Sequence, residues 1–155
     1  MSRRRPLSAP PRVVLDMPCL LRALLLSDPA AQALRRGWQE GRFKPLVCAR
    51  SARLLARALS HAPLGLDASQ QQELLADFLP YAEVVVGESA QRVPGLNPEL
   101  QMLVQLALRG QAQCLLSDRE ALWQWQAASR SAAARQLCTL QTQTSFLTAF
   151  ALGGA

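Results

Sequence analysis

The chain has 155 residues, of which 50% are hydrophobic and 18% are charged, and its 17 basic residues exceed its 11 acidic residues to give a net charge of +6. A chain of this length and apolar content forms one ordinary domain with a substantial core, which excludes disordered and fibrous classes of protein. The sequence contains no run of about 18 apolar residues, so we expect no membrane-spanning helix and no membrane partner.

The first residues form a basic, proline-rich head that contains Arg3, Arg4 and Arg5. We expect residues 1–11 to be a disordered basic arm and residues 12–152 to be a single domain. The arm is not a signal peptide, because no uninterrupted apolar segment follows its arginines. Two interpretations of its charge stay open: a solvated tail, or an arm that attracts RNA without forming a binding site.

The cysteines lie far apart in the sequence and show no Cys-x-x-Cys spacing. Each has apolar neighbours, so we expect buried free thiols rather than a zinc site or a disulfide framework. Free thiols are typical of a reducing compartment, which favours the cytoplasm. The four residues are Cys19, Cys48, Cys114 and Cys138.

Residues 12–16 form the segment around which the chain is organised. This short apolar run is rich in β-branched residues and ends on Asp16, a pattern that predicts a buried first strand. Pro18 fits the first turn of a following helix whose leucines share one face. Because open α/β sheets bind ligands at the carboxyl ends of their strands, Asp16 is the first candidate site residue.

Strand and helix patterns alternate through the rest of the chain. Asp28 predicts the N-cap of a second helix that runs to about Glu40, and either Asp67 or Ser69 caps a later helix. Pro45 moves the start of the second strand towards a sheet edge. Further strands are predicted over 43–48, 81–86, 113–117 and 137–142, and further helices over 50–59, 69–79, 98–108, 120–126, 127–135 and 145–152.

This alternation predicts an α/β fold. Short strands separated by helices of this length form a parallel sheet with right-handed crossovers that cover both faces. We therefore expect a three-layer α/β/α sandwich with a central, mainly parallel sheet of four to five strands.

Several segments resemble the PIN-domain family, the metal-dependent nuclease fold used by the toxin of many bacterial toxin–antitoxin pairs. The resemblance covers residues 12–146 in one order and one hydrophobic register. Asp16-Met17-Pro18-Cys19 stands at the family's Asp-Thr-Asn-Val, Gly41-Arg42-Phe43 at its Gly-Arg-Phe strand entry, and residues 53–59 at its Ala-Glu-Leu-x-x-Val-Leu helix. Asn97-Pro98-Glu99-Leu100 stands at Asp-Pro-Asp-Asp, and residues 112–119 resemble Ala-Asp-Tyr-Leu-Val-Thr-x-Asp.

The resemblance implies a site at which clustered carboxylates hold one or two Mg²⁺ or Mn²⁺ ions for phosphodiester hydrolysis. Carried over residue by residue, the first acid is Asp16, the second falls on Leu54, the third on Leu100 and the fourth on Arg119. No acid between residues 42 and 62 replaces the second one. Most of the metal site is therefore missing.

Two acids stand one position away from the lost ones: Glu99 beside Leu100, and Asp118 beside Arg119. Asp16, Glu99 and Asp118 remain candidate catalytic residues if the protein is active, with Asp16 and Asp118 as candidate ligands of Mg²⁺ or Mn²⁺. If the metal site is lost, no cofactor is expected. We then expect the Arg119 guanidinium to pair with Asp16 where the metal would lie.

Two functions stay open. The first is a PIN-like domain that binds RNA or a protein without cutting RNA; the second is a weak Mg²⁺- or Mn²⁺-dependent endoribonuclease, the toxin component of a pair. The partners implied are RNA, an antitoxin-like protein or a second copy in a homodimer.

Arginines supply the candidate substrate-binding residues, which are Arg53, Arg57 and Arg119. Arg50, Arg53 and Arg57 form a stripe on one predicted helix, and this stripe is either a solvated face or a ridge that binds phosphates. Ser117, at the end of the fourth predicted strand, is expected to cap the helix that follows.

Overall fold

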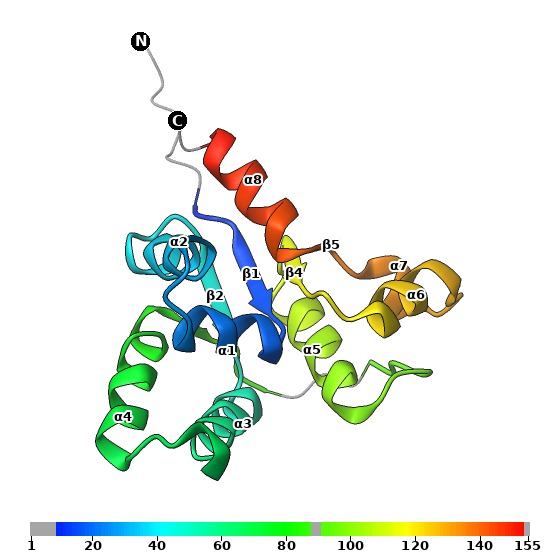
Figure 1. The fold of residues 1–155 in the computed structure, drawn as a ribbon. Coiled ribbons are helices and arrows are strands. Elements are labelled where there is room, and N and C mark those ends of the chain that lie inside the picture. Colours follow the sequence, from blue (N-terminus) through cyan, green and yellow to red (C-terminus); the bar gives the residue numbers. More distant parts are fainter. Residues whose placement is uncertain (1–8, 88–90, 154–155) are drawn as a thin grey trace.

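The computed structural model describes residues 9–87 and 91–153, so most of the predicted basic arm lies outside the described residues. Within them, five parallel strands form a sheet in the order β3-β2-β1-β4-β5 (Figure 1). The strands are β1 (Arg12–Leu15), β2 (Lys44–Val47), β3 (Glu83–Val84), β4 (Cys114–Leu116) and β5 (Thr139–Gln141). The predicted parallel α/β architecture is confirmed.

The helices begin where the sequence supplies caps. Asp28 Oδ1 accepts a hydrogen bond of 2.8 Å from the Ala31 N–H, and Asp67, rather than Ser69, caps its helix by accepting from the Gln70 N–H at 2.8 Å. In the described part of the chain, no helix has the length and apolar character needed to cross a membrane. The helices are α1 (Met17–Leu25), α2 (Pro29–Gln39), α3 (Ala49–Leu59), α4 (Ala68–Ala76), α5 (Pro98–Arg109), α6 (Glu120–Ala128), α7 (Ala132–Gln136) and α8 (Gln143–Gly153), with short 3₁₀ turns at Ala62–Leu64 and Leu79–Tyr81.

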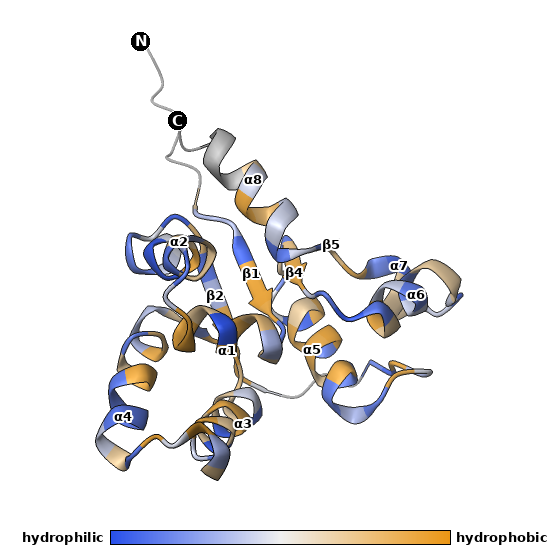
Figure 2. Ribbon diagram, in the orientation of Figure 1, coloured by the Kyte–Doolittle hydropathy of each residue, from blue (hydrophilic) through white to orange (hydrophobic). Residues whose placement is uncertain are grey.

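The sheet separates two hydrophobic clusters because alternate side chains of a strand point to opposite faces. In β1, Val13 and Leu15 pack into a cluster with α1, α2 and α3, whereas Val14 packs into the other cluster with α5, α6 and α7. Both clusters are buried, and Figure 2 shows the hydrophobic colour concentrated on β1, β4 and α5. These two cores make the fold a three-layer sandwich.

Three details of the expected structure are wrong. The third strand covers only Glu83–Val84: a 3₁₀ turn takes up Leu79–Tyr81, and Val85 and Val86 lie beyond the strand's end. The helix predicted over 127–135 is divided between α6 and α7. Ser131 starts α7 by accepting a hydrogen bond from the Ala134 N–H at 3.2 Å. Pro45 lies in β2, which is an inner strand of the sheet. Its nitrogen, which carries no hydrogen, is directed towards β3, but Pro45 comes one residue before the first β2–β3 pair, which is Leu46 with Glu83.

Arg12 joins three elements at the start of β1. Its Nη1 and Nη2 donate to the two Glu83 carboxylate oxygens at 2.7 and 2.6 Å, and its Nε donates to the Gly110 carbonyl at 2.7 Å. The hydrogen bond with Arg12 lowers the pKa of Glu83 and raises that of Arg12. The pair is half-exposed, with 33% of the Arg12 side chain and 41% of the Glu83 side chain accessible.

We expect a double-mutant cycle of Arg12→Ala and Glu83→Gln to give a coupling free energy of about 0.2–1 kcal/mol at pH 7, because exposed pairs are screened by water. The folded-state pKa of Glu83 lies below its unfolded value, so this stabilisation is present at neutral pH and is lost as the pH falls through the folded pKa. Urea unfolding of the parent, the two single variants and the double variant, at pH 7 and below about pH 3, measures this coupling free energy. Equal coupling at both pH values would contradict the assignment.

Candidate functional site

Asp16 follows the last residue of β1 and is fully buried, with 0% of its surface exposed. Its backbone N–H donates to the Leu116 carbonyl at 2.9 Å, and its own carbonyl accepts from the Leu20 N–H at 3.0 Å. These bonds hold Asp16 between the end of β4 and the first turn of α1. Although Asp16 occupies the N-cap of α1, its carboxylate makes no capping hydrogen bond and is directed elsewhere.

Each oxygen of the Asp16 carboxylate has a partner from the segment after β4. Ser117 Oγ donates to Oδ2 at 2.6 Å, and Arg119 Nη2 donates to Oδ1 at 2.8 Å. Ser117 Oγ also accepts from the Arg119 backbone N–H at 3.1 Å. The expected contact between Asp16 and Arg119 is therefore present, whereas the expectation that Ser117 caps the next helix is wrong: α6 has Arg119 at its N-cap and no side-chain cap.

Glu99 reaches the same guanidinium from the start of α5. Asn97 Oδ1 caps this helix by accepting from the Leu100 N–H at 2.9 Å, and Pro98 occupies its first turn. This start places Leu100 in the core with 1% exposed and leaves Glu99 at the strand ends. Arg119 Nη2 donates to Glu99 Oε1 at 2.6 Å and Nη1 to Oε2 at 3.4 Å.

Arg119 thus lies between two carboxylates, and 27% of its side chain is exposed. Burial acts to lower the pKa of Arg119, but the hydrogen bond with Glu99 and the charge of Asp16 raise it above its ordinary value. The Nε–H is buried without a hydrogen-bond partner. The guanidinium is consequently a permanent positive charge at this position.

Asp118 belongs to a different ion pair. Its Oδ2 accepts from Arg22 Nη2 of α1 at 2.6 Å, and Arg22 also donates to Gln143 Oε1 at 3.3 Å. Cys19 Sγ lies 3.9 Å from the same Asp118 oxygen, and burial raises the pKa of this thiol to about 11, so it is protonated and unreactive at neutral pH. Asp16 and Glu99 therefore meet through Arg119, while Asp118 pairs with Arg22.

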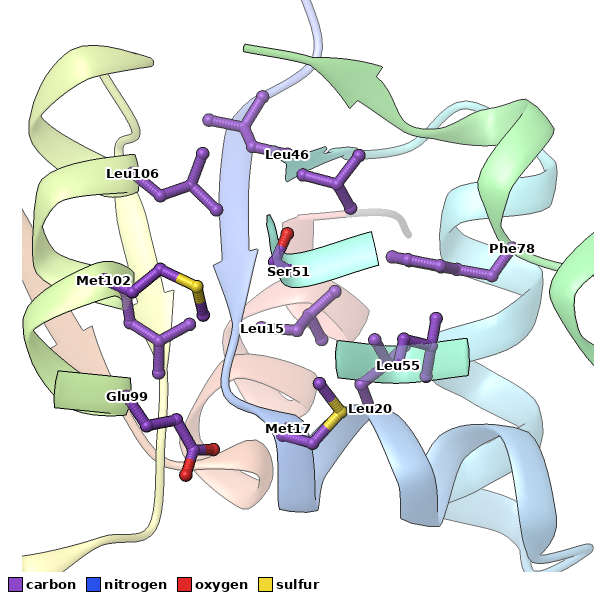
Figure 3. A pocket seen from close by; sticks show the side chains of 12 residues that line it. Leu15, Met17, Leu20, Leu46, Ser51, Leu55, Phe78, Glu99, Met102 and Leu106 are labelled. Atoms are coloured by element: carbon purple, nitrogen blue, oxygen red, sulfur yellow. The ribbon is translucent and has the colours of Figure 1, made fainter. Parts of the chain in front are cut away.

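A small pocket lies beside the strand ends, between β1, β2, α3 and α5 (Figure 3). Glu99 is the single charged residue among the described residues that line it; most of the others are apolar, including Leu15, Met17 and Met102. The cavity volume is about 20 Å³, which holds a water molecule and has no room for a nucleotide.

The residues at the strand ends do not fit a pair of hard divalent ions. Such ions need several free carboxylate oxygens, but both Asp16 oxygens and both Glu99 oxygens are already hydrogen-bonded. Leu54, at which the resemblance to the PIN family predicted the second acid to be lost, packs against the hydrophobic core. In the described residues, no three His, Cys, Asp or Glu side chains are grouped so that they could hold a metal ion.

The candidate substrate-binding arginines do not form one site. Arg119 is held between Asp16 and Glu99, whereas Arg53 and Arg57 are exposed on α3. Arg53 lines a separate groove with Arg50 and Arg109, and Arg57 does not line it.

Comparison of the chain with protein-family models, with curated proteins and with solved structures found no significant match.

Sequence reasoning missed two features of this region: the pairing of Arg22 with Asp118, and the hydrogen bond from Ser117 to Asp16. The β1–β4 register pairs Leu15 with Leu116, which sets Asp16 beside Ser117. A hydroxyl beside a buried carboxylate is a signal that this register would have revealed. Arg22 has no comparable signal, because it lies within α1 and no strand register sets it beside Asp118.

We expect Arg119→Ala to lower the free energy of unfolding by about 1–3 kcal/mol, because it leaves the buried Asp16 carboxylate with Ser117 as its remaining side-chain partner. The matched control is Arg22→Ala, which removes the other arginine–carboxylate pair at the same strand end. Both partners in that pair are 43% exposed, so the control should cost less than about 1 kcal/mol. Urea unfolding at neutral pH measures both, and equal losses would contradict the proposed burial effect.

Proposed function

We propose that the chain is a degenerate PIN-like domain that acts by binding RNA or a protein partner and does not hydrolyse RNA. The observation that carries this proposal is the Arg119 guanidinium, hydrogen-bonded to Asp16 at 2.8 Å and to Glu99 at 2.6 Å. The three-layer parallel α/β fold is compatible with a nuclease ancestry. The net charge of +6 is compatible with RNA, and an antitoxin-like protein is the other partner considered.

The chemical reason is the difference between a guanidinium and a divalent ion. Both neutralise clustered carboxylates, but a metal ion also offers open positions that polarise a phosphate oxygen and lower the pKa of a bound water molecule. A guanidinium offers directed N–H donors and neither of these. Arg119 can therefore hold the strand ends together without activating a nucleophile.

The second candidate is a weak Mg²⁺- or Mn²⁺-dependent endoribonuclease that uses Asp16, Glu99 and Asp118. It requires Arg119 to leave both Asp16 and Glu99 and Asp118 to leave Arg22, so three ion pairs must break before a metal binds. Titration with Mn²⁺ distinguishes the two candidates.

We expect calorimetric titration with Mn²⁺ at neutral pH to show no site tighter than about 1 mM, because the carboxylate oxygens are occupied by Arg119 and Ser117. A single-stranded RNA incubated with the protein and Mn²⁺ should remain uncut. Micromolar Mn²⁺ binding that Asp16→Ala abolishes, with cleavage lost in the same variant, would support the nuclease instead.

A restoration experiment tests the residue assignment. The combined change of Leu54→Glu, Leu100→Asp and Arg119→Asp should create measurable Mn²⁺ binding, because it returns carboxylates to the three lost positions. It should also lower stability, since Leu100 is 1% exposed and the new acids repel one another when no metal is present. Circular dichroism establishes that the variant folds. A folded variant without affinity for Mn²⁺ would contradict the assignment.

A further inference from the structure

A second hollow lies away from the strand-end ion pairs, between the outer strand β3, the first turns of α3 and the length of α5. Its volume is about 580 Å³. Val84, Val86 and Gly87 form one wall, Arg50 and Arg53 come from α3, and Arg109 comes from α5. We call this the β3 groove.

The wall formed by β3 is an open sheet edge. Among residues 9–87 and 91–153, β3 is the last strand of the sheet and pairs with β2 alone. The Val85 N–H donates to the Val47 carbonyl at 2.7 Å, so Val85 faces β2 and the backbone groups of Val84 face the open edge. Val84 is 58% exposed and Val86 is 77% exposed. Apolar side chains on an unpaired edge form a surface to which another strand can add.

The opposite walls are basic. The side chains of Arg50 and Arg53 are exposed and make no hydrogen bond or ion pair with another described residue. Arg109 donates from Nε to the Val86 carbonyl at 2.7 Å, which brings a third guanidinium to the end of β3. No acidic residue is among the described residues that line the groove. The groove therefore complements negative charge beside an apolar edge.

We propose that the β3 groove docks an extended segment of a partner protein in which apolar and acidic residues alternate. This inference rests on the proposed binding function and names its partner class. A segment added to β3 would pair with the backbone of Val84 and place successive side chains on opposite faces. Val85 packs into the core on the α5 face, so Val84, the preceding residue of β3, points to the other face. Acidic side chains would then face Arg50 and Arg53, and apolar ones would cover Val84.

Two other occupants fit less well. RNA uses aromatic side chains to stack bases, and the described residues that line the groove include none. A second copy of the chain, paired edge to edge, would bring the arginines of one groove towards those of the other, and like charges repel. A separate acidic segment can both form hydrogen bonds with the open edge of β3 and neutralise the arginines of the groove.

The test uses a fluorescein-labelled peptide of about eight residues that alternates Val and Glu, measured by fluorescence anisotropy with the full chain. We expect saturable binding that Arg53→Glu weakens by about tenfold or more. Arg57→Glu is the matched control, because it makes the same charge change on an exposed residue of α3 outside the groove, and it should change affinity by less than about twofold. A peptide with Lys in place of Glu should not bind.

A second pair of peptides tests the sheet edge. N-methylation at every other residue blocks one hydrogen-bonding edge of the peptide, so one of the two complementary methylated peptides should lose binding and the other should keep it. Equal binding of the Lys and Glu peptides, or of both methylated peptides, would overturn the proposal.

Three further results would also overturn it: no binding of the Val-Glu peptide, an Arg53-dependent complex with a single-stranded RNA, or dimerisation in sedimentation that Val84→Glu abolishes. None of these results depends on Mn²⁺, so failure here is distinguishable from failure of the proposed loss of metal chemistry.

Discussion

The buried carboxylate of Asp16 is the constraint on which this structure depends. An uncompensated charge with 0% exposure would cost several kcal/mol, so the fold must supply partners for both oxygens. Ser117 and Arg119 supply them from the turn after β4, and Arg119 then recruits Glu99 from α5. Compensation of one acid thereby fixes the ends of two strands and the start of a helix in a single hydrogen-bonded group.

The turn after β4 directs two adjacent charged residues, Asp118 and Arg119, to different partners. Asp118 is directed to Arg22, which links the turn to α1 and to Gln143 at the start of α8, while Arg119 is directed inwards to Asp16. Both partners of the outer pair are half-exposed, so we expect its loss to cost little. Loss of Arg119 from the inner pair would leave the fully buried Asp16 carboxylate without its cation, so we expect it to cost more. The difference of one position along the chain decides which residue reaches the buried acid.

The alternation of short apolar strands with helical patterns was sufficient to predict a parallel sandwich, and in the structure β1, β2 and β4 each contribute side chains to both cores. The same patterns mispredicted two details of the sheet. Segment 81–86 forms only a two-residue strand after a 3₁₀ turn. Pro45 lies inside the sheet and is tolerated there because β3 is short. The Asp16–Arg119 contact was predictable from charge balance at neighbouring strand ends. The fate of Asp118 was not, because it depends on the direction of a side chain within a turn and on Arg22 from a distant helix.

The contacts of Asp16 join residues that are far apart in the chain: 101 positions separate it from Ser117 and 103 separate it from Arg119. Such contacts require β1 and β4 to be already side by side, so they close after most of the loop entropy has been lost. Interactions that form late in folding act mainly on the rate at which the native state opens. We therefore expect loss of the Asp16–Arg119 bond to raise the unfolding rate more than it lowers the folding rate.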